Sequence, residues 1–317
     1  MITELVGYSF KVKEPIHAAI KRIAQEEIAS AANQLEGHGD PDRDEAIHEA
    51  RKNVKKVRGL LKLMRPELGA TYAIENARFR EIGQKLSEFR DSGAMLEIFD
   101  QLAEVYVRDW AGHDTTPIRA KLLEEKAFRE SAAGIGEILA AVSAELRSAS
   151  EDVKGWPLQA DGLEAISPGL EATYRSGRRA MKRALREPLP ENFHGWRKRV
   201  KDHWYHVRLI GQVCGEALAF YQKNLRHLET CLGDDHNLAV LQQKLSKEPE
   251  LYGSQEVIGM FLDSVKQRQQ SLRSTAESIG QQIYQEKPRM FVKQMRTLWE
   301  GRIKDRERIY SSLPVTG

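Results

Sequence analysis

The sequence predicts an all-α protein, and three observations support this. Ala, Leu, Glu, Lys, Arg and Gln, which favour helices, dominate the 317-residue chain. Only 11 prolines and 23 glycines interrupt it, and the apolar pattern is helical almost throughout. The stretch HEARKNVKKVR at residues 48–58 also has a near copy, HGWRKRVKDHW, at residues 194–204. We therefore expect a helical unit that occurs twice.

The first half of the chain predicts an arm followed by several helices. Residues 2–13 alternate weakly and favour a short strand or arm. A helix is expected at 16–35, because Pro15 stands near its start and Gly37 beyond its end. The following helices are expected at 42–65, which Pro66 ends, at 68–90, at 92–110 and, after a break at 112–117, as one or two helices to about residue 148.

The second half begins after a predicted linker at 151–169, EDVKGWPLQADGLEAISPG, which carries two prolines and several glycines. Beyond it no strand pattern of weight occurs. Helices are expected at about 169–187, 191–212, 215–232, 235–246, 254–285 and 288–303. We therefore divide the chain into a first helical half, 1–155 with an arm at 1–13, and a second half, 156–317.

The repeat extends beyond the two basic stretches when the offset between them, 194 − 48 = 146 residues, is kept fixed. Basic residues stay in register over about 45 residues without a gap. The matched pairs include His48 with His194, Arg51 with Arg197, Lys52 with Lys198, Lys55 with Lys201, Lys62 with Arg208, Arg80 with Arg226, and Arg90-Asp91 with His236-Asn237. This match indicates an internal duplication of a helical unit.

Helical spacing gathers the basic residues into stripes beside apolar faces. The first stripe holds His48, Arg51, Lys52, Lys55, Arg58, Lys62 and Arg65, and the second holds His194, Arg197, Lys198, Lys201 and Arg208. A third stripe holds Arg175, Arg178, Arg179, Lys182, Arg183 and Arg186, and a thinner one holds Lys21 and Arg22. Exposed helices usually mix charges, because like charges at this spacing destabilise them. Residues 50–65 carry seven basic side chains and no acidic one, which favours a bound polyanion over a solvated or internally paired face.

Several other classes of function lack their sequence signals. The net charge is only +3, so the distribution of charge says more than its total. No phosphate-binding Gly-rich loop, catalytic triad, metal-ligand motif or DNA-reading element is evident, and we expect neither catalysis nor a metal nor a cofactor. Trp196 replaces Ala50 and Trp204 replaces Arg58 in the repeat, and a core role is expected for Trp196. A phosphate-rich ligand without bases therefore fits best. With two cysteines, no evident signal peptide and no long apolar run, we expect a soluble cytoplasmic protein.

Taken together, these stretches resemble the CHAD family of α-helical domains. The resemblance covers about residues 10–311 and rests on the two basic stretches, on FRD at 89–91, on GLEATYRSGRR at 169–179 and on LGDDHNL at 232–238. It implies two similar four-helix-type bundles, related by a pseudo-twofold axis, around a central basic cavity. The family binds inorganic polyphosphate, and some members associate with polyphosphate granules. No E-x-E-x-K signature of a fused triphosphatase domain is present, so the chain looks like a stand-alone version.

The resemblance implies a large set of polyphosphate-binding residues. They are Lys21, Arg22, His48, Arg51, Lys52, Lys55, Lys56, Arg58, Lys62, Arg80, Arg90, Tyr174, Arg175, Arg178, Arg179, Lys182, Arg183, His194, Arg197, Lys198, Lys201, Arg208 and Arg226. Two positions depart from the pattern: Asn237 stands where the family tends to have an acid, and Asp202 is the counterpart of Lys56. Whether His48 and His194 contact the ligand or are structural stays open. Nucleic-acid binding, a scaffold for an acidic protein partner and an enzyme acting on polyphosphate are the alternatives.

Overall fold

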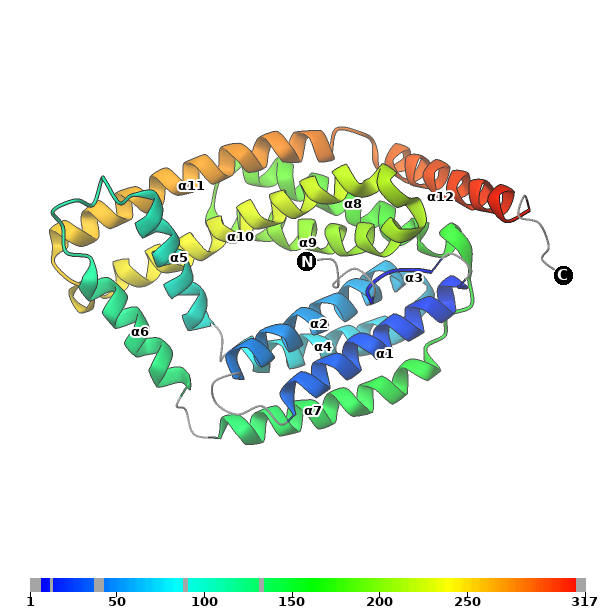
Figure 1. Ribbon diagram of the computed structural model, residues 1–317, viewed down its shortest axis with the longest axis horizontal. Coiled ribbons are helices and arrows are strands. Elements are labelled where there is room, and N and C mark those ends of the chain that lie inside the picture. The colour runs from blue at the N-terminus through cyan, green and yellow to red at the C-terminus, as the bar shows by residue number, and fades with distance from the viewer. Residues whose placement is uncertain (1–6, 12–13, 37–42, 88–90, 131–133, 312–317) are drawn as a thin grey trace.

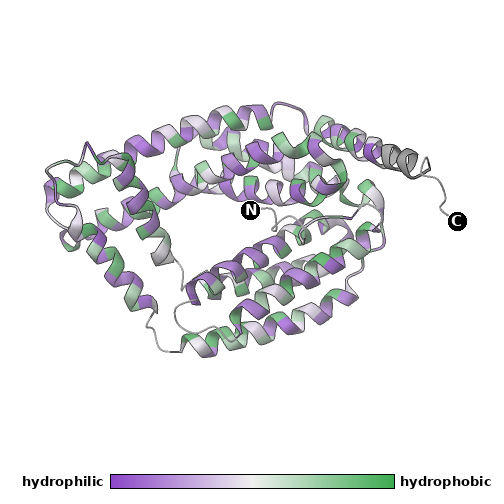
Figure 2. Ribbon diagram, in the orientation of Figure 1, coloured by the Kyte–Doolittle hydropathy of each residue, from purple (hydrophilic) through white to green (hydrophobic). Residues whose placement is uncertain are grey.

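A computed structural model describes residues 7–11, 14–36, 43–87, 91–130 and 134–311 of the chain. Within these ranges all the regular secondary structure is helical and no strand forms, which confirms the all-α prediction. Figure 2 shows polar and apolar residues sharing the same helices, as amphipathic helices that pack on one side require. Among the described helices, none combines the length and the apolar character needed to cross a membrane.

The first bundle consists of α1 (Ile16–Leu35), α2 (Arg43–Leu63), α4 (Ala70–Ser87) and α7 (Ile135–Asp152), with the single turn α3 (Arg65–Leu68) after α2. Helix α1 packs between α2 and α7, and α2 packs on α4 (Figure 1). Buried residues recur along one face of each of these helices and pack into a shared core. Most of them are aliphatic, among them Ile20, Ile23, Val54, Val57 and Leu146.

The second bundle consists of α8 (Gly162–Arg186), α9 (Pro190–Cys214), α10 (Ala219–Lys247), α11 (Gln255–Ile283) and α12 (Pro288–Ser311). Helix α9 lies between α8 and α10, and α10 packs on α11. The core is richer in aromatic residues than that of the first bundle. Trp196 is fully buried in it, as its place on the packing side of the repeat predicts.

Helices α5 (Asp91–Val105) and α6 (Thr116–Glu130) come from the first half of the chain but contact the second bundle, as Figure 1 shows. The Phe99 ring stacks on Phe261 of α11 at 5.6 Å between centroids. Trp110 follows α5, and its indole N–H donates to Ser264 Oγ at 2.9 Å inside the core. Part of the first half of the sequence therefore completes the core of the second bundle.

Several element boundaries differ from the sequence predictions. The predicted linker at 151–169 is much shorter, because α7 continues to Asp152 and α8 already starts at Gly162. Pro168 lies inside α8 in its second turn, where it removes the backbone N–H that would bond to the Glu164 carbonyl, and the helix continues past it. The two helices predicted at 215–232 and 235–246 are wrong, since α10 is continuous after a short 3₁₀ turn at Gly215–Leu218. Residues 7–11 form turns rather than a strand, and residues 1–6 and 12–13 lie outside the described ranges.

The two bundles meet where α2 crosses α9. A Cβ on Gly59 would lie 3.4 Å from the Cβ of Tyr205, so the helices approach closely at this point. His206 Nε2 lies 2.8 Å from the Gly59 carbonyl oxygen across the same crossing. The N-terminal arm reinforces the contact, because the backbone N–H of Phe10 donates to the Leu209 carbonyl at 2.9 Å. The crossing is therefore a packed contact that fixes the facing sides of α2 and α9.

Candidate anion-binding site

Four basic residues, two from each bundle, converge beside the α2–α9 crossing. Arg51 and Lys55 lie on α2, and Arg197 and Lys201 lie at the equivalent positions of α9. We call these four residues the basic seam. Partial removal from water, followed by repulsion from Lys201, Arg51 and Arg197, lowers the pKa of Lys55 to about 7. Lys55 as a residue nevertheless keeps exposed surface, while like charges crowd its ammonium.

The seam arises from the same local packing in each half of the repeat. Arg51 Nη1 approaches the carbonyl oxygen of Ser87, at the end of α4, at 3.5 Å. Arg197 lies against Gly233 of α10, where a Cβ would come within 3.4 Å of its Nε. Residues 87 and 233 are 146 apart, the offset that also relates the two arginines. Equivalent residues thus meet equivalent neighbours, although a pseudo-twofold axis for the whole fold stays a prediction.

One carboxylate lies within the seam, and the repeat gave no sign of it. Glu229 of α10 stands 3.1 Å from Lys201 Nζ and 3.7 Å from Arg197 Nη2, with only 16% of its side chain exposed. Burial raises the pKa of Glu229, but Lys201 and Arg197 outweigh that effect and the pKa is lowered, so the group is ionised at neutral pH. Its counterpart in the first half is Gly83, and a search for matched cations therefore passes over it.

Further along the crossing the predicted cations are paired with acids. Lys62 Nζ lies 2.6 Å from Asp202 of α9, and Arg199 lies 3.6 Å from the same carboxylate. Arg58 Nε donates to Asn76 Oδ1 at 3.3 Å, and burial lowers the pKa of Arg58. Asp202 therefore neutralises much of the positive charge of Lys62 and Arg199. Its counterpart in the repeat is Lys56, so the two halves differ in charge at this position.

Another group of predicted residues surrounds the arm and Trp204. Lys56 Nζ lies 3.0 Å from Glu27, a pair that joins α2 to α1. The Arg208 guanidinium lies over the Trp204 ring at 4.9 Å, and Arg226 lies over the same ring at 5.8 Å. Cation–π contacts of this kind hold both arginines against α9. Arg80 is exposed on α4.

The third stripe lies on the outer face of α8. Arg175, Arg179 and Lys182 are exposed, on the side opposite the buried Gly177 and Met181. Within the stripe Arg175 pairs with Glu171, while Arg183 lies 3.8 Å from Glu187. The close contact of α8 with α2, where Gly169 touches Leu63, is nearer the start of α8 than the stripe is.

Three predicted residues have contacts that fasten the fold. The Tyr174 hydroxyl donates to the Ile283 and Glu286 carbonyls at 3.1 and 3.2 Å, and burial raises the pKa of Tyr174 to about 12. Lys21 Nζ donates to the Lys154 carbonyl at 3.0 Å. Arg22 pairs with Glu14 at 2.6 Å and with Glu26 at 2.9 Å. Arg178, half-buried on α8, adds positive charge near Tyr174. Arg90 lies outside the described residues.

The two family histidines open the basic stretches near the seam. The His194 ring stacks on His236 at 3.9 Å between centroids. Burial, and then the neighbouring His236, Lys198 and Arg197, lower the pKa of His194 to about 4, so the ring is neutral at pH 7. His48 Nε2 lies 3.8 Å from Glu49, which also pairs with Lys52 at 2.7 Å. In both histidines Nδ1 is buried without a hydrogen-bond partner among the described residues.

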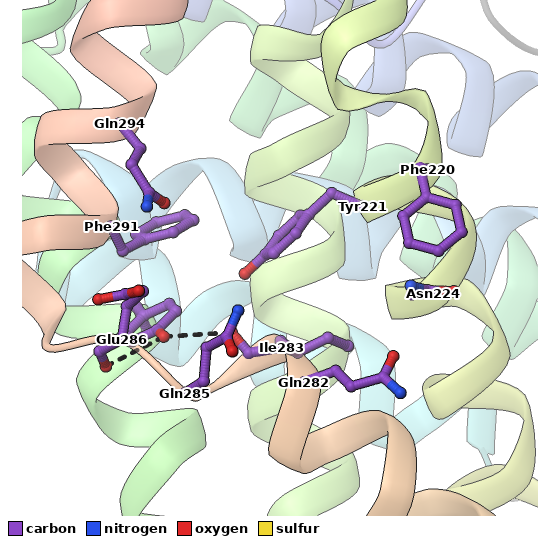
Figure 3. Close-up of a pocket in the computed structure, with 10 residues that line it drawn as sticks. Phe220, Tyr221, Asn224, Gln282, Ile283, Gln285, Glu286, Phe291 and Gln294 are labelled. Carbon is purple, nitrogen blue, oxygen red and sulfur yellow. Dashed lines mark hydrogen bonds between the residues drawn. The ribbon is translucent and has the colours of Figure 1, made fainter.

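A pocket of about 360 Å³ lies elsewhere, between α10 and the junction of α11 with α12 (Figure 3). Tyr221 and Phe291 form its aromatic walls, and the amides of Asn224, Gln285 and Gln294 line the rest. No Lys or Arg is found among the described residues that line it. A polyanion would gain little there, and the seam is the better candidate site.

The part of the chain that the structure describes holds no cluster of metal-ligating side chains. No group of three His, Cys, Asp or Glu side chains is placed to hold an ion there. Cys214 and Cys231 are both buried as free thiols, and burial raises the pKa of each. Neither is therefore activated as a thiolate.

One comparison with known proteins finds a match to the chain. A family model described as the CHAD domain matches residues 22–246. The match runs from within α1 to the end of α10 and includes all four seam residues and Glu229. A search of curated proteins finds no match to the chain.

Proposed function

Because the chain belongs to the CHAD domain family, we propose that it binds inorganic polyphosphate at the basic seam without catalysing a reaction on it. The observation that carries this proposal is the convergence of Arg51, Lys55, Arg197 and Lys201 from the two bundles. Natural folds rarely hold like charges together unless a partner gains from them. Burial and the neighbouring cations disfavour the charged form of Lys55 and lower its pKa, and a bound anion would stabilise that charged form.

Polyphosphate suits the seam because it offers a line of charged oxygens with no bases to recognise. Guanidinium groups such as those of Arg51 and Arg197 can each bind two phosphate oxygens, and the lysines add point charges between them. The nearby Lys198 is exposed on α9 and extends the basic surface. Neutralising several phosphates releases counterions, so affinity should fall steeply as salt rises.

The residues of α8 are proposed to play a lesser part. Their stripe is solvent-exposed, and Arg175 and Arg183 within it already lie beside acids, so it would add less to binding than the seam. His48 and His194 are proposed to lie beside the ligand rather than to supply its charge, because His194 is neutral at physiological pH. Binding in the cytoplasm or on polyphosphate granules belongs to the same proposal.

The first test replaces all four seam residues with alanine and titrates long-chain polyphosphate at two salt concentrations. We expect the affinity to fall by about 100-fold or more, since each lost charge-assisted contact contributes roughly 1.5–3 kcal/mol. The matched control removes two arginines and two lysines from remote positions, as Arg119→Ala, Arg129→Ala, Lys121→Ala and Lys266→Ala. An equal loss in the control, or unchanged binding in a folded seam variant, would refute the proposal.

Two further arms separate the alternatives. Single-stranded DNA at equal phosphate concentration should displace polyphosphate poorly, because the seam offers no aromatic platform for bases. Effective displacement would instead favour a nucleic-acid-binding protein. Incubation with polyphosphate and Mg²⁺ should release no phosphate, and release that depends on the seam would replace the binding role with an enzymatic one.

A further inference from the structure

Glu229 is the feature of the seam that polyphosphate binding alone does not explain. A carboxylate repels phosphate, yet Glu229 lies inside the site and contacts Lys201 and Arg197, two of its four cations. It also attracts Lys55 electrostatically, against the repulsion from the other seam cations. The side chain is held at the seam by α10 and is mostly buried, so it cannot swing far into water.

The contacts that Glu229 makes are the ones that a phosphate would need. Lys201 Nζ donates to Glu229 Oε1 at 3.1 Å. The Nε of Arg197 is buried and has no acceptor among the described residues, although its Nη2 lies 3.7 Å from the same Oε1. Glu229 therefore pairs with only part of the Arg197 guanidinium, and the Nε–H donor has no acceptor among the described residues.

From these contacts we propose that Glu229 is a built-in counter-anion that sets the shortest polyphosphate able to bind. In the unliganded protein it holds the seam cations together. An incoming ligand must take Lys201 and Arg197 from it, and only a chain that also reaches Arg51 and Lys55 gains enough to do so. This inference rests on the proposed function, of which it names the specificity-determining residue.

The repeat matches cations between the two halves but does not match the acids Glu229 and Asp202. The counterpart of Glu229 is Gly83, and the counterpart of Asp202, which pairs with Lys62, is Lys56. Neither Glu229 nor Asp202 therefore has an acidic counterpart in the first half. Glu229 thus neutralises part of the α9 side of the seam, and a ligand that bridges the bundles would contact Arg51 and Lys55 as well.

The test uses the full chain with Glu229→Gln, which keeps the shape and removes the charge. The matched control is Glu145→Gln, which removes the same charge from a remote ion pair with Lys85 at 3.0 Å. We expect Glu229→Gln to bind tripolyphosphate about tenfold more tightly than wild type, equivalent to about 1.4 kcal/mol. The gain for long chains should be smaller, because these also bind Arg51 and Lys55.

A second measurement needs no polyphosphate. In low salt the unliganded Glu229→Gln protein should melt at a lower temperature than wild type, and added salt should remove most of the difference by screening the seam cations. Glu145→Gln should show neither effect. Equal melting temperatures for the two variants, or a Glu229→Gln protein that binds tripolyphosphate no better than wild type, would overturn the inference. If wild type itself binds no polyphosphate, the proposed function fails, while the melting comparison still decides whether Glu229 is a counter-anion.

Discussion

Lys55 is the residue of the seam whose charge state is most affected by its neighbours. It lies on α2 one turn before the crossing, exposed to water but close to Arg51, Arg197 and Lys201. Desolvation and these three cations bring its pKa to about 7, far below the ordinary value for lysine. A bound polyanion would stabilise the charged form, so ligand binding and protonation of Lys55 are coupled.

This coupling predicts how binding responds to pH. In the free protein Lys55 is charged below pH 7 and neutral above it, whereas in the complex its pKa is raised. Affinity for polyphosphate is therefore expected to be constant below pH 7 and to fall by about tenfold between pH 7 and 8.5, since one pKa unit corresponds to 1.36 kcal/mol. Titrations at constant ionic strength would measure it.

Lys55→Arg provides the control for the pH dependence. Arginine keeps its charge throughout this range, so the affinity of the variant should stay nearly level from pH 6 to 8.5. Calorimetry in two buffers of different ionisation enthalpy should also show proton uptake near pH 7.5 for wild type and none for the variant. A variant that retains the full pH dependence would mean that another group is responsible.

At the level of elements, the crossing of α8 over α2 depends on one glycine. A Cβ on Gly169 would lie 2.0 Å from the Leu63 carbonyl oxygen, a distance that no side chain can occupy. The sequence placed this glycine at the end of a linker, whereas the structure places it inside α8, where its small size is what matters. Sequence patterns see glycine as a helix breaker and cannot see a backbone that approaches from another helix.

Gly169→Ala is therefore expected to destabilise the protein by about 2–3 kcal/mol, because the bundles must move apart to accept the methyl group. Gly259→Ala is the matched control, since it lies in α11 with no neighbour within 4 Å of the added Cβ. That change should stabilise the protein by roughly 0.5–1 kcal/mol through helix propensity. Urea unfolding of the two variants would measure both. Equal effects of the same sign would contradict the close approach.

For the whole molecule, the first half of the sequence completes the second bundle. The rings of Phe99 and Trp110 cover Phe261 of α11, and the arm residue Phe10 bonds to α9. Division of the sequence near residue 155 follows the repeat, but these contacts cross it. Each half is thus expected to need the other for a complete core.

We expect residues 156–317, expressed alone, to form helices without cooperative unfolding, since Phe261 and Leu209 would lose their cover. Co-expression with residues 1–155 should restore a single sharp urea transition of the reassembled pair. Circular dichroism in the far and near ultraviolet would distinguish helix content from fixed aromatic packing. A sharp transition in the isolated second half would show that it is an independent domain.

The sequence alone determined the helices, the duplication and the cationic character of α2 and α9. These follow from local propensity, periodicity and spacing, which act over a few turns. It also placed Arg51, Lys55, Arg197 and Lys201 among a larger set of cations that the repeat matches in pairs. Tertiary structure alone decided that these four meet, that Glu229 lies among them, and that Tyr174, Arg22 and Lys21 also make contacts between elements of the fold. Such contacts join residues far apart in the chain, and packing at the α2–α9 crossing fixes them in a way that helical spacing cannot express.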